Sequence, residues 1–390
     1  MKFSLSSESL AESIAAAITS VPARPTEPIV GGVLIDAEAA SCDTVSFASF
    51  NYERSTTRIT VADVMKPGRV VVSGRLLAAV GSNLPRGATC QVQVDGSQMS
   101  IIAGRTEFRL PLLRVDDYPT LPGITQEHLI GTVDCDAFAD AVRVVGTYAS
   151  EDPATELHNL TALNIQCDPG SLVLCSTDRY IIGRRRLEWT AAGDPTAINV
   201  PAADVLATVK ALTGPTVGAE LEILWNGSLF GLRSGASTVV TRTLGNEFPN
   251  VDGIMQTDVY FATATVFTSD LIEALRRAAS IADDQHAQVD LAVGGDTLSV
   301  ATTKSDTGKT HDAITATHHG GARRLSLSSR RLHNALSIID HDVVTLGFRE
   351  KGYLLTIHPG PTDSDALRQP ERDSIALLMG IQGVSTASTR

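Results

Sequence analysis

The sequence predicts an α+β protein made of three similar domains, and three observations support this. Three segments each consist of a short apolar strand, a small capping residue and an amphipathic helix, and the capping positions Ser73, Pro201 and Ser328 lie 128 and 127 residues apart. A further amphipathic helix precedes each segment. The rest of the chain alternates apolar and polar residues with the period of two that strands require. This repetition predicts three domains, with residues 1–128, 129–257 and 258–390.

Each copy is expected to contain two helices. A Ser hydroxyl at an N-cap satisfies an early backbone N–H, and Pro is tolerated at a helix entrance because it has no N–H to satisfy. The earlier helix of each copy is predicted from apolar residues at helical spacing. These earlier helices are expected over Glu8–Thr19, Asp136–Ala149 and Ser269–Ala282.

Strand hairpins are predicted in each copy, between and after the helices. Asn226-Gly227 separates two apolar runs, and both residue types tolerate the positive φ of tight two-residue turns. Asp95-Gly96 and Gly294-Gly295 occupy comparable places in the other two copies. Three copies of a unit of helix, strands, helix and strands make an α+β chain of three similar domains.

Composition excludes several classes of protein. Of the 390 residues, 43% are apolar and 19% charged, which is typical of a globular chain rather than a disordered one. The sequence has no apolar run of about 18 residues, so we expect no membrane span and no membrane partner. The five cysteines are scattered without a C-x-x-C pair, which favours a cytoplasmic location over a disulfide framework or a zinc ribbon.

Motifs for enzymatic chemistry are missing from the sequence. There is no Gly-rich phosphate loop and no nucleophile elbow, so we predict no catalytic residues and no cofactor. His311-Asp312 with His318-His319 fits no standard ligand spacing, and we expect no metal. An enzyme whose site is built by unrecognised loops on a repeated α+β scaffold stays open as an alternative.

Several segments together resemble the bacterial DNA polymerase III beta subunit, the sliding clamp. Their order along the chain, together with the threefold repeat, carries the resemblance. The segments are Met1-Lys2-Phe3, Arg24–Val30 (which resembles R-P-T-x-P-I-L), Pro67-Gly68, Gly104–Pro111 followed by Tyr118-Pro119, and Ser176–Tyr180 (which resembles A-T-D-x-[HY]).

This resemblance implies a DNA clamp fold in a ring-shaped homodimer. Helices would line the central hole and antiparallel sheets would form the outer wall. Duplex DNA would thread the hole, so the clamp would hold the replicative polymerase on its template and provide processivity in DNA replication. The implied partners are double-stranded DNA, the DNA polymerase III catalytic subunit, the clamp-loader complex, other proteins with clamp-binding motifs and a second copy of the chain.

Three groups of site residues follow from the resemblance and from the repeat. Basic residues on the lining helices and nearby loops are expected to contact phosphates without reading sequence. These DNA-binding candidates are Arg24, Arg75, Arg143, Lys210, Arg276, Arg277, Arg330 and Arg331. The resemblance also implies an apolar peptide-binding pocket between the second and third domains, formed by Leu160, Thr177, Asp178, Tyr180, Ile182, Pro249, Ile254, Leu377, Leu378 and Met379. It places the dimer interface at Arg105, Phe108, Leu110 and Ile281, with Asp283 or Asp284 near Arg105.

The predicted pocket departs from the family pattern. The family's H-R-L continuation is Tyr180-Ile181-Ile182 here, and its closing M-P-[MV]-R is Met379-Gly380-Ile381-Gln382, followed by the tail 383–390. These changes remove two arginines and a proline from the pocket. A specialised or resistance-conferring clamp paralogue with an altered pocket is therefore an alternative to the main replicative clamp.

The charge balance of the chain limits how it can bind DNA. There are 32 basic and 44 acidic residues, a net charge of -12, and none of the three predicted domains is net basic. This excludes a tight, static groove binder, which needs a basic face. A ring needs only a basic inner wall, so the acidity is compatible with a clamp.

Overall fold

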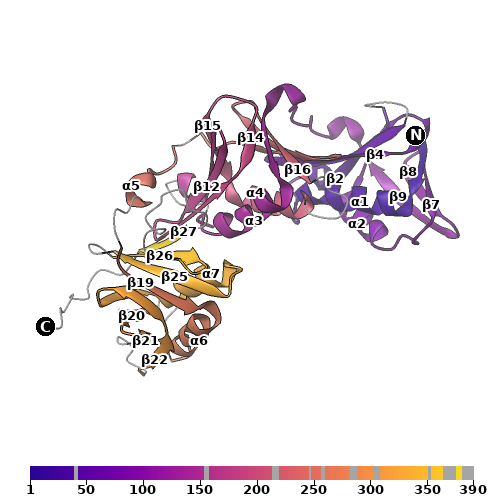
Figure 1. Cartoon of the computed structure of the whole chain (residues 1–390). Helices are drawn as coiled ribbons and strands as arrows, with labels where there is room; N and C mark the ends of the chain where they lie inside the picture. Colours follow the sequence, from indigo (N-terminus) through magenta and orange to yellow (C-terminus); the bar gives the residue numbers. More distant parts are fainter. Residues whose placement is uncertain are drawn as a thin grey trace. The chain divides into compact units, whose positions relative to one another are not determined.

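The computed structural model describes most of the chain, and the described part divides into two compact units (Figure 1). The described residues are 1–38, 43–152, 158–212, 219–245, 247–255, 260–281, 288–302, 308–349, 353–362 and 375–379. Unit 1 comprises Met1–Ala139, Asp168–Gly170 and Trp189–Leu244, and unit 2 comprises Asp140–Cys167, Ser171–Glu188 and Gly245–Arg390.

One order of elements occurs three times along the chain: strand, helix, five strands, helix, three strands. The first run is β1 (Lys2–Ser6), α1 (Ser7–Ala17), β2 (Gly32–Asp36), β3 (Thr44–Phe50), β4 (Arg54–Val61), β5 (Asp63–Lys66), β6 (Arg69–Ser73), α2 (Gly74–Gly81), β7 (Thr89–Asp95), β8 (Gln98–Ala103) and β9 (Thr106–Leu113). The second is β10 (Leu129–Asp134), α3 (Cys135–Gly146), β11 (Ala162–Asp168), β12 (Ser171–Thr177), β13 (Ile181–Leu187), β14 (Trp189–Ala191), β15 (Thr196–Pro201), α4 (Ala202–Leu212), β16 (Glu220–Trp225), β17 (Leu229–Ser234) and β18 (Ser237–Arg242).

The third run follows a short helix, α5 (Asp252–Met255), that the sequence did not predict. It is β19 (Tyr260–Phe267), α6 (Thr268–Ala279), β20 (Gln288–Gly294), β21 (Thr297–Ala301), β22 (His311–Thr315), β23 (Thr317–Gly320), β24 (Arg323–Ser328), α7 (Ser329–Ile338), β25 (Val343–Arg349), β26 (Leu354–Pro359) and β27 (Ile375–Met379). Short 3₁₀ helices are η1 (Ile18–Ser20), η2 (Pro28–Gly31), η3 (Val115–Asp117), η4 (Gln126–His128) and η5 (His158–Thr161).

Antiparallel sheets run through both units, which confirms the predicted α+β class. In unit 1 the strand order is β14-β10-β16-β17-β18-β4-β3-β2-β6-β9-β8-β7-β1-β5. In unit 2 one sheet contains the order β11-β12-β13-β27-β26-β25-β19-β23, and another contains β22-β21-β20-β24. Strands from successive runs pair directly: β4 with β18 in unit 1, and β13 with β27 in unit 2.

The cores lie between the sheets and the helix pairs. In unit 1, α1 packs against α2, and Leu10, Ile14 and Leu77 of these helices join one buried cluster with Phe3 and Phe47. In unit 2, α6 packs against α7, and their apolar faces join a cluster with the strands of the third run. Within the described residues, no helix combines the length and apolar character needed to cross a bilayer.

Two local predictions need correction. The Ser328 hydroxyl caps α7 by accepting a hydrogen bond from Arg331 N, as expected, but the Ser73 side chain makes no capping bond to α2. The hairpins form where predicted, yet their turns are centred one residue later. In the pairing of Trp225 with Phe230 the two central residues are Gly227 and Ser228, and Gly227 has φ 96°. The glycine therefore takes the first central position, where positive φ is needed.

Candidate functional site

The predicted pocket motif forms a tight turn between β12 and β13. Asp178 Oδ1 accepts hydrogen bonds from the backbone N–H groups of Tyr180 and Ile181, each at 2.9 Å. Thr177 Oγ1 donates to Ile181 O at 2.8 Å, and Arg179 adopts φ 81°. An Asp side chain stabilises such a turn because it replaces a backbone acceptor. The turn holds the Tyr180 side chain 52% exposed.

A residue of α7 lies on this turn. The Cζ atom of Arg331 is 4.1 Å from the centroid of the Tyr180 ring, and Arg331 Nη2 is 3.5 Å from Asp178 Oδ2. The first distance is a cation–π contact, which suits a planar guanidinium. Arg331 was predicted from its helix position to contact DNA, and in the structure it contacts two predicted pocket residues.

Apolar side chains form a small cluster behind the turn. Cys175, Ile182 and Val251 are buried together, with Phe248 and Leu354 packed against them. Four of these, Cys175, Phe248, Val251 and Leu354, were missed by the sequence prediction, which included only Ile182. The strand register indicated Cys175, because it lies two residues before Thr177 and so shares its face of β12.

A cavity of about 370 Å³ lies beside the turn, between the chain that follows α3 and one face of α7. Tyr148, Asp178, Ile181, Arg330, Arg331 and Asn334 are among its lining residues. The Tyr148 ring rests on the backbone of β13: a Cβ added at Gly183 would lie 2.0 Å from Tyr148 Cδ2. Burial raises the pKa of the Tyr148 phenol above its ordinary value, and the ring forms one wall of the cavity.

Unit 1 contains the same turn at the end of β3. Asn51 Oδ1 accepts hydrogen bonds from Glu53 N at 3.1 Å and Arg54 N at 2.6 Å, and Tyr52 has φ 72°. Asn51 and Tyr52 precede Asp178 and Arg179 by 127 residues, the spacing of the repeat. Asp204 and Arg331, the third residues of α4 and α7, are also 127 apart. The turn and the helix residue facing it are therefore equivalent in the two units.

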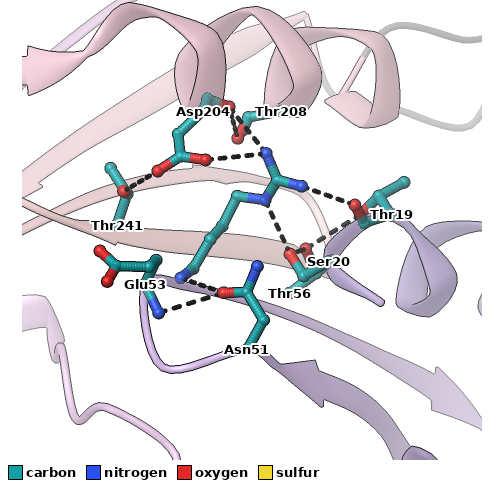
Figure 2. Close-up of polar contacts among 9 residues, drawn as sticks. Thr19, Ser20, Asn51, Glu53, Thr56, Asp204, Thr208 and Thr241 are labelled. Carbon is teal, nitrogen blue, oxygen red and sulfur yellow. Dashed lines mark hydrogen bonds and ion pairs between the residues drawn. The ribbon is translucent and has the colours of Figure 1, made fainter. Parts of the chain in front are cut away.

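In unit 1 the helix residue also contacts the turn, but the charges are reversed (Figure 2). The helix supplies the acidic Asp204, and the basic Arg54 belongs to the turn. Arg54 Nη1 is 3.2 Å from Asp204 Oδ1, Nη2 donates to Thr19 O at 2.8 Å, and Nε donates to Ser20 Oγ at 3.1 Å. The second carboxylate oxygen of Asp204 accepts a hydrogen bond from Thr241 at 3.0 Å. The two charged side chains are only 12% and 21% exposed. This contact is a well-saturated ion pair.

The remaining predicted pocket residues are spread over several elements. Leu160 is buried in η5, Pro249 is half-buried beside Phe248, and Ile254 is exposed on α5. Ile182 pairs with Leu377 and Ile181 with Leu378 across β13 and β27, which brings the third copy's last strand to the turn. The side chains of Leu377, Leu378 and Met379 lie outside the described residues, as does the tail 383–390.

The DNA-binding candidates fall into two groups. Arg24, Arg75, Arg276 and Arg330 are exposed and make no ion pair within the described part of the chain. Two other candidates form ion pairs with acidic residues. Arg143 lies 3.6 Å from Asp140, and Arg277 lies 2.9 Å from Asp312 and 3.4 Å from Glu273. The side chain of Lys210 is outside the described residues. Arg185 of β13, which is not among these candidates, pairs with Asp140 of α3 at 2.8 Å.

The dimer-interface candidates lie on or next to β9 and α6. Phe108 is half-buried, Arg105 is exposed in the turn before β9, and Ile281 is exposed just after α6. Leu110 is buried in the core of unit 1, so it has little surface left for a partner. Asp283 and Asp284 lie outside the described residues.

Comparison with known proteins identifies the family. The model of the DNA polymerase III beta subunit N-terminal domain matches residues 1–122, and that of the C-terminal domain matches residues 260–366. The beta sliding clamp of Streptomyces coelicolor is 31% identical over 355 residues, 89% of this chain and 91% of that protein. The beta sliding clamp of Micrococcus luteus is 34% identical over 288 residues, 73% of this chain and 89% of that protein. The crystal structure of the Pseudomonas aeruginosa DNA polymerase III subunit beta has a TM-score of 0.86 at 18% identity, covering 98% of this chain and 100% of that one. The chain therefore belongs to the DNA polymerase III beta subunit family.

Proposed function

We propose that this protein is a DNA sliding clamp, a homodimeric ring that encircles duplex DNA and tethers the replicative DNA polymerase. The relatives are named beta sliding clamps, and their names set the general role. The single observation that supports a ring is a contact that repeats between successive copies of the fold. In this contact, which we call the joint, a strand of one copy pairs with the last strand of the next copy. We propose three domains, 1–128, 129–257 and 258–390, because the order of elements repeats in each.

Two joints of one kind are made inside the chain. In each, the strand that follows the turn pairs with the last strand of the next copy: β4 with β18, and β13 with β27. In each, the third residue of the next copy's second helix also reaches the turn. Three copies in one chain can make only two such joints with each other.

A third joint would be formed by β22 and β9, and among the described strands each of them has an edge that is unpaired or only partly paired. Among the described strands β22, the third copy's counterpart of β4, is at the edge of its sheet. β9, the first copy's counterpart of β18, pairs with β8 on one side, and on the other pairs with β6 only at Leu112 and Leu113. We infer that β22 of one copy adds to β9 of another. Such a head-to-tail contact between different surfaces generates a closed ring when its rotation closes, and we propose that two copies close it here.

Oligomeric state tests the ring directly. We expect the chain, of 41.2 kDa, to sediment as a dimer of about twice that mass. Phe108→Arg, in the stretch of β9 that does not pair with β6, should shift the population to monomer. Tyr353→Arg, at an exposed aromatic outside β9 and β22, should leave the dimer intact. A monomeric parent chain with measurable enzymatic turnover would instead favour the enzyme alternative.

We propose that DNA contacts come from exposed basic side chains on the helices and on nearby loops. Arg24, Arg75, Arg276 and Arg330 suit this role because no described carboxylate neutralises them. Contacts to phosphates alone permit sliding, because base contacts would hold the protein at one sequence. Arg143, Lys210, Arg277 and Arg331 remain candidates with less support.

We propose that partners bind the turn and the apolar cluster of unit 2. Polymerase, clamp loader and other partners would insert a short peptide with apolar anchors, as in other peptide-in-groove complexes. Cys175, Ile182 and Val251 supply the apolar floor, and the turn supplies fixed polar groups. The test is the affinity of a Leu-Phe anchor peptide, which Ile182→Asp should abolish.

We place the protein in the cytoplasm, where its four described cysteines, all buried, would stay reduced.

A further inference from the structure

Arg54 lies in unit 1 at the place that corresponds to the cavity in unit 2. Four residues that line the cavity have counterparts around this place, at the spacing of the repeat. The lining residues are Thr147, Tyr148, Ile181 and Arg331. Their counterparts, 128 or 127 residues earlier, are Thr19, Ser20, Arg54 and Asp204. The guanidinium of Arg54 donates a hydrogen bond to each of the other three, so it lies among the residues that surround an open space in unit 2.

A shared contact shows that the two places are comparable. Ser49 Oγ donates to Ala17 O at the end of α1, and Ser176 Oγ donates to Val145 O at the end of α3. The two serines are 127 residues apart and the two acceptors are 128 residues apart. Each unit therefore holds the end of its first helix against the same position of the neighbouring strand. The two places differ in what fills them.

The acceptors around Arg54 form a binding site for a guanidinium (Figure 2). Nη2 donates to Thr19 O at 2.8 Å, Nε donates to Ser20 Oγ at 3.1 Å, and Nη1 lies 3.2 Å from Asp204 Oδ1. Thr19 belongs to η1, which continues from the C-terminal end of α1, where a helix favours a cation. The acceptors lie on three sides of one plane, which suits the planar fork of a guanidinium better than an ammonium.

Contacts that do not involve Arg54 hold these acceptors in place. Ser20 Oγ lies 2.7 Å from Thr56 Oγ1. The second carboxylate oxygen of Asp204 accepts a hydrogen bond from Thr241 Oγ1 at 3.0 Å. A site whose polar groups are already fixed loses little conformational freedom when it binds a ligand. The acceptors should therefore keep their arrangement when the Arg54 side chain is removed.

We propose that unit 1 contains a latent binding site for an alkylguanidinium group, and that Arg54 occupies this site as an internal ligand. In the native chain Arg54 keeps the site closed to other ligands. In unit 2 the counterpart is the apolar Ile181, which donates no side-chain hydrogen bond, and a cavity of about 370 Å³ remains beside it. The latent site lies at the turn between β3 and β4, and the inference does not rest on the proposed peptide pocket.

Chemical rescue of the full-length protein tests the proposal. Arg54→Ala removes the side chain beyond Cβ, and ethylguanidinium supplies the atoms that are lost. We expect millimolar ethylguanidinium to raise the melting temperature of Arg54→Ala and to leave that of the parent chain unchanged. Ethylammonium has the same charge without the planar fork, and should bind about tenfold more weakly. Sodium chloride keeps the ionic strength of all samples equal, so that charge screening is the same.

Two further variants locate the response. The double variant with Arg54→Ala and Asp204→Asn has lost the carboxylate of the site, and should lose most of the response to ethylguanidinium. Arg114→Ala vacates an exposed pair with Asp117, 3.5 Å long, and should show no response. If Arg54→Ala does not fold alone, ethylguanidinium should restore its folding, measured by the fluorescence of the two tryptophans, both of which lie in unit 1.

Three results would overturn the latent site. One is equal stabilisation of Arg54→Ala by ethylguanidinium and ethylammonium, since charge alone would then explain the effect. Another is an undiminished response of the double variant, which would place the bound cation away from Asp204. The third is the absence of any response, in melting or in refolding. Stabilisation of the parent chain to the same extent would show that Arg54 does not close the site, contrary to the proposal.

Discussion

Asn51 and Asp178 hold the same turn in two copies of one fold. In each, Oδ1 accepts hydrogen bonds from the backbone N–H groups two and three residues later, and the next residue, Tyr52 or Arg179, has positive φ. What differs is the contact across the joint. The Arg54–Asp204 pair is saturated and mostly buried, whereas Arg331 over Tyr180 has donors to spare. The joint in unit 1 therefore stabilises the fold, whereas the joint in unit 2 leaves donors of Arg331 available for binding.

The first prediction concerns the saturated joint. Arg54→Met leaves Asp204 without its cation in a mostly buried position and should lower the free energy of unfolding by about 2–3 kcal/mol. Both tryptophans of the chain, Trp189 and Trp225, lie in unit 1, so tryptophan fluorescence in urea reports its unfolding. Arg114→Met is the control. Its pair with Asp117 is 3.5 Å long and exposed, and its loss should cost less than about 0.5 kcal/mol.

The second prediction concerns the wall of the unit 2 cavity. Gly183→Ala would place a methyl group 2.0 Å from Tyr148 Cδ2, so the buried ring must move, at a cost of about 1–3 kcal/mol. The shift should be seen in unfolding followed by circular dichroism, with the tryptophan transition of unit 1 unchanged. Gly123→Ala, with nothing within 4 Å of the added Cβ, should leave both transitions in place.

The third prediction compares two adjacent arginines of α6. Arg277 is already paired with Asp312 and Glu273, whereas Arg276 makes no ion pair in the described structure. Arg276→Gln should therefore weaken binding to short duplex DNA more than Arg277→Gln. It should also reduce the slope of log affinity against log salt by about 0.9, the value for one phosphate contact. Equal effects of both substitutions would contradict this ranking.

The fourth prediction concerns pH. The Gly87 N–H donates to Glu8 Oε1 at 2.7 Å and lowers the pKa of this carboxyl below its ordinary 4.5. A lowered pKa stabilises the fold above pH 4.5, and this contribution is lost as pH falls through the folded value. Glu8→Gln should therefore lower the melting temperature at pH 7, and the difference should vanish in acid. A difference in melting temperature that persisted unchanged in acid would show that the Glu8–Gly87 bond is not the cause.

Periodicity predicted the repeated elements well because each depends on local spacing. The second helices begin at Gly74, Ala202 and Ser329, directly after the predicted capping residues. Turn centres were less accurate. In the 226–229 turn, Asn226 N donates to Leu229 O, and this moves Gly227 into the position that requires positive φ. The residue types in the turn do not distinguish this register from the one that is shifted by one residue.

The site was predicted only in part because its main contact is long-range. Sequence reasoning identified Asp178 and Tyr180 by resemblance, but grouped Arg331 with the DNA-binding residues from its place on a helix. The joint brings the third residue of α7 onto a turn some 150 positions earlier, and no local pattern encodes that contact. The repeat carried a usable signal: Asp204 and Arg331 are equivalent residues of opposite charge, facing turns of the same construction.

The central claim is that the protein encircles DNA, and topological retention tests it most directly. The protein is loaded with a bacterial clamp loader onto a nicked circular plasmid, and the complex is isolated by gel filtration. We predict that it remains bound at salt that dissociates ordinary contacts, and that it is released when a restriction enzyme linearises the plasmid. Retention on linear DNA with free ends, or dissociation from the circle at the same rate, would contradict the account.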